Sequence, residues 1–236
     1  MRVALLSDIH SNLEALEAVL GAMPAVDRIL VLGDIVGYGP DPNAVIARLR
    51  SVNARGVRGN HDQAMFQPSM LAEFNPHAAA AARWTASALT PQSRGYLGAL
   101  PAHGRIGRHR LVHGSPRKPY IWEYILDELQ ALEILVELGR RWCFFGHTHL
   151  PRIFTEEGEQ IPDLAEWIAL PPSALINPGS VGQPRDGNPQ ASFAVADLDG
   201  EKVQFYRVPY DIPTTQAKIR EAGLPEIEAL RLGQGR

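Results

Sequence analysis

Seven Asp, His and Asn side chains are the residues of this sequence whose types and spacing could do chemistry. They lie beside Gly, Asn or His at the ends of short apolar runs and are Asp8, His10, Asp34, Asn60, His113, His147 and His149. Carboxylate, imidazole and amide groups bind divalent cations, and no Cys is among them. Seven donors exceed the needs of one tetrahedral ion and suit two ions that share a ligand. The set therefore predicts metal-assisted phosphate chemistry.

The carboxylates in this set explain how two ions could share one site. Asp34 has two oxygens and can bridge two cations, which then clamp a phosphoryl group and share one hydroxide as the nucleophile. Two divalent ions outweigh the negative charges of Asp8, Asp34 and the hydroxide. Asn60 would bind a metal without adding negative charge. The site would therefore keep a positive surplus that favours an anionic phosphate ester.

Alternating strands and helices must position the first of these donors. Continuous apolar runs predict strands at 3–6, 29–32 and 54–57, and apolar spacing predicts helices after Ser11-Asn12 and through 45–49. Asp8, Asp34 and Asn60 follow the three strands at intervals of 26 residues. The C-terminal ends of neighbouring parallel strands meet at one edge of an open α/β sheet, where ligands bind. We therefore expect these three side chains to converge.

The remaining sequence contains a helical segment and a second group of strands. Residues 64–100 are Ala-rich and include the capping pair Thr90-Pro91, so we expect helices that cover part of the site. Further strands are predicted at 110–112, 142–145, 152–155, 174–176, 192–196 and 203–208, with a helix at 128–138 and one or two short helices in the last 25 residues. Turns between the later strands indicate antiparallel pairing. We expect a single domain over residues 1–236.

Composition is that of an ordinary globular protein. The chain has 236 residues, a net charge of −3, 45% hydrophobic and 21% charged residues. This charge gives no strong signal for general nucleic-acid binding. The one cysteine, Cys143, excludes an internal disulfide, suits a reducing compartment and is expected to be buried and inert. No secretion signal or membrane-spanning run is evident, so we expect a cytoplasmic protein without a membrane partner. The oligomeric state is not specified by the sequence.

These motifs together resemble those of the calcineurin-like metallophosphoesterases. The matching segments are Asp8-x-His10, Gly33-Asp34, Gly59-Asn60-His61-Asp62, His113 and Gly146-His147-x-His149. The resemblance extends from residue 3 to about 185 and is greatest to the small bacterial and archaeal phosphodiesterase-like branch, which also carries a segment like Asn177-Pro178-Gly179-Ser180. It implies an α/β fold, a four-layer α/β/β/α sandwich of two mixed β-sheets, with the metal site at the strand C-terminal ends.

The resemblance also implies a role for each motif residue. One metal ion would be held by Asp8, His10 and His149, the other by Asn60, His113 and His147, and Asp34 would bridge them. His61 would be catalytic rather than a ligand, and would stabilise developing charge or protonate the leaving oxygen. The two divalent ions are expected to be Mn²⁺ first, with Fe²⁺, Zn²⁺, Co²⁺ or Ni²⁺ as alternatives.

One departure from the family pattern bears on the substrate. The protein serine/threonine phosphatase branch has an Asp and an Arg where this chain has Gly37 and Tyr38. The acidic partner of the catalytic His is then missing, and Asp62 is a candidate to orient His61 instead. The candidates for substrate binding are Arg117, Arg185 and Tyr38, whereas His77, His103 and His109 are expected to be surface or packing residues and the role of Arg58 stays open.

The sequence thus predicts a metal-dependent phosphoesterase that hydrolyses a phosphate ester, foremost a phosphodiester of a small molecule or nucleotide. The expected nucleophile is a hydroxide bridging the metals, with His61 assisting the leaving group. Alternatives within the enzyme class are a dinucleoside-polyphosphate hydrolase, a phosphoprotein phosphatase and a nuclease. The alternative of another class is a metal-binding scaffold without catalytic activity.

Overall fold

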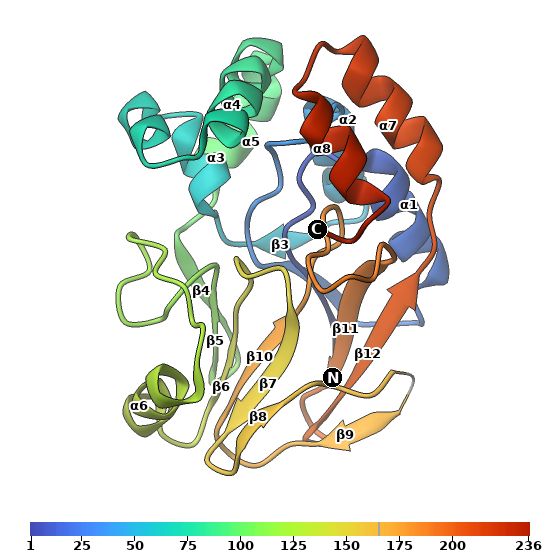
Figure 1. Cartoon of the computed structure of the whole chain (residues 1–236). Helices are drawn as coiled ribbons and strands as arrows, with labels where there is room; N and C mark the ends of the chain where they lie inside the picture. The colour runs from blue at the N-terminus through green and yellow to red at the C-terminus, as the bar shows by residue number, and fades with distance from the viewer. Residues whose placement is uncertain (165) are drawn as a thin grey trace.

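The computed structural model describes residues 1–164 and 166–236, which contain two mixed β-sheets lying face to face (Figure 1). The strands of the first sheet are β1 Arg2–Leu6, β2 Arg28–Val31, β3 Arg55–Gly56, β9 Trp167–Ala169, β11 Ala191–Asp197 and β12 Lys202–Val208. They follow the order β3-β2-β1-β11-β12-β9. β1, β2 and β3 are parallel, as the strand and helix alternation predicted, and the other pairs are antiparallel.

The second sheet is built from the middle of the chain. Its strands are β4 His103–Ile106, β5 His109–Val112, β6 Trp142–Phe144, β7 Pro151–Thr155, β8 Gly158–Gln160 and β10 Ala174–Pro178, in the order β4-β5-β6-β10-β7-β8. The expected antiparallel pairing holds between β10 and β7 and between β7 and β8. β10 also pairs in parallel with β6, which in turn is parallel to β5. Each sheet therefore has a parallel half whose strands can deliver residues to one edge.

Alternation along each strand separates the layers. Val3 and Leu5 of β1 pack toward the second sheet, whereas Ala4 and Leu6 pack against helices α1 (Leu13–Ala22) and α2 (Pro42–Ser51). The second sheet repeats this arrangement, because the β6 residue Cys143 packs with helix α6 (Glu128–Leu138) while its neighbours face the first sheet. The order is helices, sheet, sheet, helix, so the predicted α/β/β/α sandwich with two mixed sheets is confirmed.

The remaining helices gather at one end of the two sheets (Figure 1). They are α3 Asn60–Ala64, the 3₁₀ helix η1 Pro68–Ala72, α4 Pro76–Ala88, α5 Pro91–Ala99, α7 Ile212–Glu221 and α8 Glu226–Leu232. Side-chain caps define where several begin: the Asn12 side chain accepts from the Ala15 amide at the start of α1, and the Thr90 hydroxyl accepts from the Ser93 amide at the start of α5. Within the described ranges, none of these helices has the length and apolar character needed to cross a membrane.

Three strands were not expected from the sequence: β4, β8 and β9. All three lie at sheet edges, and β4 alternates exposed with half-buried residues and has no fully buried position. β8 and β9 have three residues each. β4 and β8 are largely polar, and β9 is apolar but only three residues long, so none of the three shows a recognisable strand pattern.

Candidate metal centre

The seven predicted donors meet where the parallel halves of the two sheets end. Asp8 follows β1, Asp34 follows β2, and Asn60 begins α3 just after β3. His113 follows β5 and His147 follows β6, so the second sheet contributes from the opposite side. Six of the seven side chains are buried and Asn60 is half-buried. The convergence inferred from the spacing of 26 residues therefore occurs at the sheet ends.

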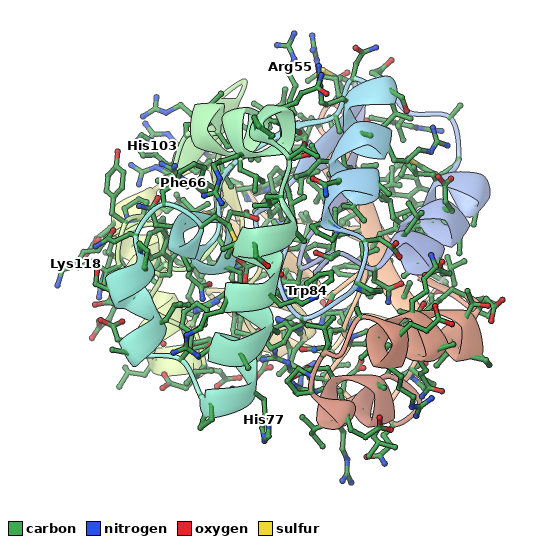
Figure 2. The ribbon with its side chains drawn as sticks, turned by 90° about the horizontal axis from the view of Figure 1, so that it is seen from above. Arg55, Phe66, His77, Trp84, His103 and Lys118 are labelled. Atoms are coloured by element: carbon green, nitrogen blue, oxygen red, sulfur yellow. The ribbon has the colours of Figure 1, made fainter. Side chains whose placement is uncertain are left out.

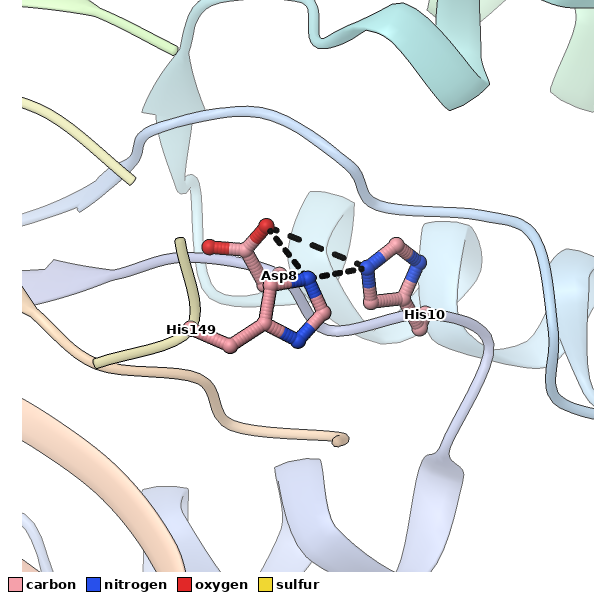
Figure 3. Close-up of side chains that lie close together, drawn as sticks. All are labelled: Asp8, His10 and His149. Carbon is pink, nitrogen blue, oxygen red and sulfur yellow. Dashed lines mark hydrogen bonds and ion pairs between the residues drawn. The ribbon is translucent and has the colours of Figure 1, made fainter. Parts of the chain in front are cut away.

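The first group of donors consists of Asp8, His10 and His149 (Figure 3). The Nε2 atoms of His10 and His149 are 3.2 Å apart, and they lie 3.8 and 3.3 Å from Asp8 Oδ1. One donor atom from each of the three residues lies within 4.8 Å of the others. Two imidazoles and a carboxylate in this arrangement can surround one divalent cation.

The second group consists of Asp34, His113 and His147. Asp34 Oδ2 is 3.1 Å from His113 Nε2, which is itself 3.1 Å from His147 Nδ1. The same Oδ2 atom lies 3.8 Å from His10 Nε2 in the first group. The Asp34 carboxylate therefore lies between the two groups, where one side chain can serve both.

Backbone carbonyl groups orient three of the imidazoles. His10 Nδ1 lies 3.1 Å from the Val36 carbonyl oxygen, His113 Nδ1 lies 2.8 Å from that of Leu32, and His149 Nδ1 lies 2.6 Å from that of Gln183. With Nδ1–H donating to a carbonyl, the lone pair is on Nε2, the atom that faces the other donors. This is the tautomer that a metal-binding histidine needs.

The loops that carry the donors have an uncommon backbone conformation. Asp8, His10, Asp34, His147 and His149 all have positive φ angles, between 48° and 71°. Side-chain-bearing residues avoid this left-handed region, which costs on the order of 1–3 kcal/mol for each residue and is typical of functional sites. Glycines permit the close approach: a Cβ on Gly59 would overlap the Asp34 carboxylate, and one on Gly146 would overlap Ser7.

Burial and neighbouring charges shift the pKa values of the donor residues. Burial raises the pKa of Asp8 to about 6. Burial would also raise the pKa of Asp34, but His113, His61 and His10 lower it well below its usual range. Burial opposes the charge on His113 too, yet the Asp34 and Asp8 carboxylates outweigh it and raise the pKa of His113 to about 9. His10, His147 and His149 have pKa values lowered mainly by burial.

Two unpaired oxygens test whether these residues fit a cation. Asp8 Oδ1 and Asn60 Oδ1 are buried, and neither has a hydrogen-bond partner within the described structure. A buried oxygen without a partner costs about 1–3 kcal/mol. Both are hard donors beside imidazole nitrogens, so the donor set fits divalent cations of the first transition row.

His61 lies against this cluster. Its main-chain N–H donates to Asp34 Oδ1 at 2.9 Å, and its ring contacts His10, Tyr38 and Phe74 with centroid separations of 4.9, 4.6 and 4.6 Å. Burial lowers the pKa of His61 to about 4, against the opposing effect of Asp34. A ring nitrogen of His61 also lies within 4.8 Å of donor atoms on His10 and Asp34.

The sequence suggested Asp62 as the partner that orients the His61 ring, but the Asp62 carboxylate accepts hydrogen bonds from backbone amides instead. Its Oδ1 accepts from the amides of Ile35 and Val36 at 3.0 and 3.1 Å, and its Oδ2 accepts from Gly59 at 3.0 Å. His61 Nδ1 has no hydrogen-bond partner among the described residues. Asp62 therefore joins the loop after Asp34 to the loop before Asn60.

The candidate substrate-binding residues lie in different places. Tyr38 is buried between the rings of His10 and His61. The Arg185 guanidinium lies 5.8 Å from the Tyr38 ring centroid, and its charge further lowers the pKa values of His10 and His149, which burial lowers first. Arg117 instead pairs with Glu133 and Glu137 of α6 at 2.9 and 2.8 Å, which directs it away from the donors.

Four further basic residues lie outside the cluster. His77 and His103 are exposed and point outward in Figure 2, as expected. His109 is buried and stacks on Trp142 with ring centroids 4.7 Å apart, which is the expected packing role. The Arg58 guanidinium lies 5.8 Å from the ring centroid of Phe66.

A cavity of about 480 Å³ opens beside the donors. Asn60, His61, His147 and Tyr38 form its inner end, and η1 and the start of α4 form one wall. The other wall is the segment 120–124, in which the Tyr124 ring stacks on His147 at 3.8 Å. The wall from η1 and α4 agrees with the helices expected at 64–100 to cover part of the site. The wall from 120–124 was not expected, since isolated aromatic residues in an irregular segment have no periodic signal.

Comparisons with known proteins identify relatives over the full length. The sequence profile of the calcineurin-like phosphoesterase superfamily domain matches residues 1–201. An uncharacterized protein from Methanocaldococcus jannaschii is 37% identical over 241 residues, which cover 99% of this chain and 98% of that protein. Phosphodiesterase YfcE from Escherichia coli K12 is 30% identical over 211 residues, covering 84% of this chain and 89% of that protein.

A solved structure gives the same result for the fold. The crystal structure of a metallophosphoesterase from Sphaerobacter thermophilus has a TM-score of 0.87 to this chain and is 41% identical, and each chain is covered completely. The similarity therefore includes the C-terminal helices α7 and α8, which lie beyond the region that the profile matches.

Proposed function

This chain belongs to the calcineurin-like phosphoesterase superfamily, and on that premise we propose that it hydrolyses a phosphodiester with the help of two divalent metal ions. The family resemblance inferred from the motifs is confirmed, and the chain is a metal-dependent phosphoesterase. The observation that carries the finer proposal is the position of Asp34. Its Oδ2 lies 3.1 Å from His113 Nε2 and 3.8 Å from His10 Nε2, between two separate groups of donors.

Each group would hold one ion. Asp8, His10 and His149 would hold the first; Asn60, His113 and His147 would hold the second; and Asp34 would bind both. Such ions supply Lewis-acid stabilisation of phosphate charge and ionise a water at neutral pH. Mn²⁺ is our first choice, because carboxylate and amide oxygens accompany the imidazoles.

The chain's own residues would complete the reaction. In hydrolysis the oxygen of a water forms a bond to phosphorus, the ester P–O bond breaks, and the leaving oxygen takes a proton. His61 lines the cavity beside Asn60 and His147, so we assign it the role of stabilising or protonating that leaving oxygen. Arg185, whose guanidinium is held by Gln183 Oε1 at 2.7 Å, would bind a phosphate oxygen.

The surroundings of Asp34 favour a diester over a phosphoprotein. Gly37 and Tyr38 occupy the positions where the phosphoprotein branch has an acidic residue and an arginine, and the Tyr38 ring covers His10 and His61. A scaffold without activity is disfavoured because His61 is present beside the complete donor set. The free, buried thiol of Cys143 agrees with a cytoplasmic setting, which we also propose.

The test is hydrolysis after controlled metal loading. Metal-stripped protein is titrated with Mn²⁺, Fe²⁺, Zn²⁺, Co²⁺ or Ni²⁺, and rates are measured on bis(p-nitrophenyl) phosphate and p-nitrophenyl phosphate, alongside elemental analysis. We expect about two ions per chain and higher kcat/KM for the diester. Arg117→Ala serves as a control variant, because the Arg117 side chain pairs with α6, and its rates and metal content should equal those of the unaltered protein. Inactivity toward both esters with every metal would refute the proposal.

A further inference from the structure

We propose that the cavity beside the metal centre selects substrates in which a single phosphate is esterified to an uncharged arm that carries a planar aromatic ring. This inference rests on the proposed function, because it assumes that the phosphate lies at the donor cluster. Asn60 and His147 belong both to the donors and to the cavity lining, so a group attached to that phosphate would extend into the cavity.

Aromatic side chains form much of the cavity. Five of its fourteen lining residues are aromatic, compared with 7% of the whole sequence. They are Tyr38, Phe74, Tyr120, Trp122 and Tyr124. Phe74 comes from the segment before α4, whereas Tyr120, Trp122 and Tyr124 come from the opposite wall. Two facing walls with aromatic residues suit a flat ring that stacks between them.

The charge of the lining argues against a second phosphate. Within the described part of the chain, none of the residues lining this cavity is Lys or Arg, and Glu73 supplies a carboxylate. A further phosphate would need cationic donors and would meet repulsion from Glu73. Arg185, the cation beside Tyr38, would serve the phosphate at the donor cluster. The cavity therefore favours an uncharged ester arm over a polyphosphate chain.

The size of the cavity fits one such arm. Small-molecule pockets have volumes of roughly 300–1,000 Å³, and this cavity of about 480 Å³ is in the lower half of that range. One aryl ring or one nucleoside can enter it together with water. The chemistry common to both is a planar aromatic surface, and the experiment separates the two.

Binding of product-like monoesters to Mn²⁺-loaded protein tests the inference without relying on turnover. Isothermal titration at equal free Mn²⁺ compares methyl phosphate, phenyl phosphate, AMP and ADP. We expect phenyl phosphate, AMP or both to bind about tenfold more tightly than methyl phosphate because of stacking. ADP should bind no more tightly than AMP. A larger gain for AMP than for phenyl phosphate would indicate a nucleoside, and the reverse would indicate an aryl group.

Substitution of a rim residue links that preference to the cavity. Tyr120 is 64% exposed and lines the cavity, so Tyr120→Ala should fold and should reduce the ratio of phenyl to methyl affinity severalfold. Leu129→Ala on α6, at a position 70% exposed and outside the lining, should leave the ratio unchanged.

Three results would overturn the inference: equal affinity for methyl phosphate and both aromatic esters, tighter binding of ADP than of AMP, or no binding of any of these ligands. Failure of the proposed function is a separate result. It would appear as absent hydrolysis of bis(p-nitrophenyl) phosphate in protein that still binds the aromatic monoesters.

Discussion

His61 is the residue on which the distinction between a metal-binding protein and a catalyst depends. It contacts the Asp34 carboxylate through its main-chain N–H, whereas its imidazole lines the cavity. His61→Ala keeps the main-chain contact and removes only the ring. We therefore expect unchanged metal content and a fall in kcat of about 100-fold or more on a diester, the range typical of general acid catalysis.

Elemental analysis and steady-state kinetics on the same preparation check this prediction. His77→Ala, an exposed change on α4, is the matched control and should alter neither quantity. If His61→Ala lost metal in proportion to activity, then His61 would be a ligand, which its distance from His10 and Asp34 also allows. Unchanged activity would remove the residue from the reaction altogether.

At the residue scale, the chemical types of the side chains predicted the metal donors, whereas the directions of other side chains could not be predicted. The seven donors could be found because Asp, His and Asn at strand ends are uncommon in combination. The structure brings six of them into two groups, and Asn60 lines the cavity with His147. Arg117 could not be placed, since its direction depends on Glu133 and Glu137 of a helix beginning eleven residues later. Asp62 was equally undetermined, because its three partners are backbone amides from two loops.

Among the elements, α8 supports the metal centre although it lies near the end of the chain. Glu228 on α8 is buried and accepts from Gln183 Nε2 at 3.0 Å. Gln183 in turn accepts from Arg185 through its side chain, and its carbonyl oxygen lies 2.6 Å from His149 Nδ1. The helix therefore positions one proposed phosphate-binding residue and one proposed metal ligand.

Removal of this support should weaken substrate binding more than turnover. We expect Glu228→Ala to raise KM for a diester by roughly fivefold to thirtyfold, as loss of a buried hydrogen bond of about 1–2 kcal/mol implies, with a smaller effect on kcat. Ile227→Ala, a 44% exposed position on the same helix, is the control and should leave KM unchanged.

A double-mutant cycle separates positioning from helix stability. If Glu228 acts through Arg185, adding Glu228→Ala to Arg185→Ala should have little further effect on KM. Fully additive effects, or a lower melting temperature without a change in KM, would show that Glu228 only stabilises α8.

The elements themselves were predictable where apolar residues are continuous. β1, β2, β6 and β11 contain runs of apolar residues, and such a run indicates a strand even when its neighbours in the sheet are unknown. β4 and β8 were missed because they are largely polar edge strands, and β9 because its three residues are too few to show a pattern. The wall formed by 120–124 was missed for a related reason, since it has no repeating pattern and is positioned by contacts such as that of Tyr124 with His147.

Across the whole molecule, the donor cluster draws its residues from both sheets. Asp8 and Asp34 follow strands of the first sheet, whereas His113 and His147 follow strands of the second. Ions bound by both sets of donors would link the two sheets at this end. No disulfide could do so, because the one cysteine of the sequence is free. The ions would also neutralise the buried carboxylates and pair with the unpartnered oxygens of Asp8 and Asn60.

Metal removal should therefore lower global stability. A ligand present at 100 times its dissociation constant adds about 2.7 kcal/mol. For a chain of this length, each kcal/mol corresponds to roughly 2–4 °C in melting temperature. We expect the melting temperature to fall by about 5–10 °C or more after chelation and to recover with Mn²⁺. Scanning calorimetry of the full chain with and without chelator measures the change.

Variants in each group of donors show whether both ions contribute to this stability. His149→Ala removes a donor of the first group and His113→Ala one of the second, so each should lose part of the stabilisation by Mn²⁺. Arg117 pairs with residues of α6, so Arg117→Ala should keep all of the stabilisation by Mn²⁺. If chelation left the melting temperature of the unaltered protein unchanged, the buried carboxylates would be stabilised by the imidazoles alone. This result would also contradict preferential binding of the ions to the folded chain under these conditions, because a ligand that binds only the folded chain must raise its stability.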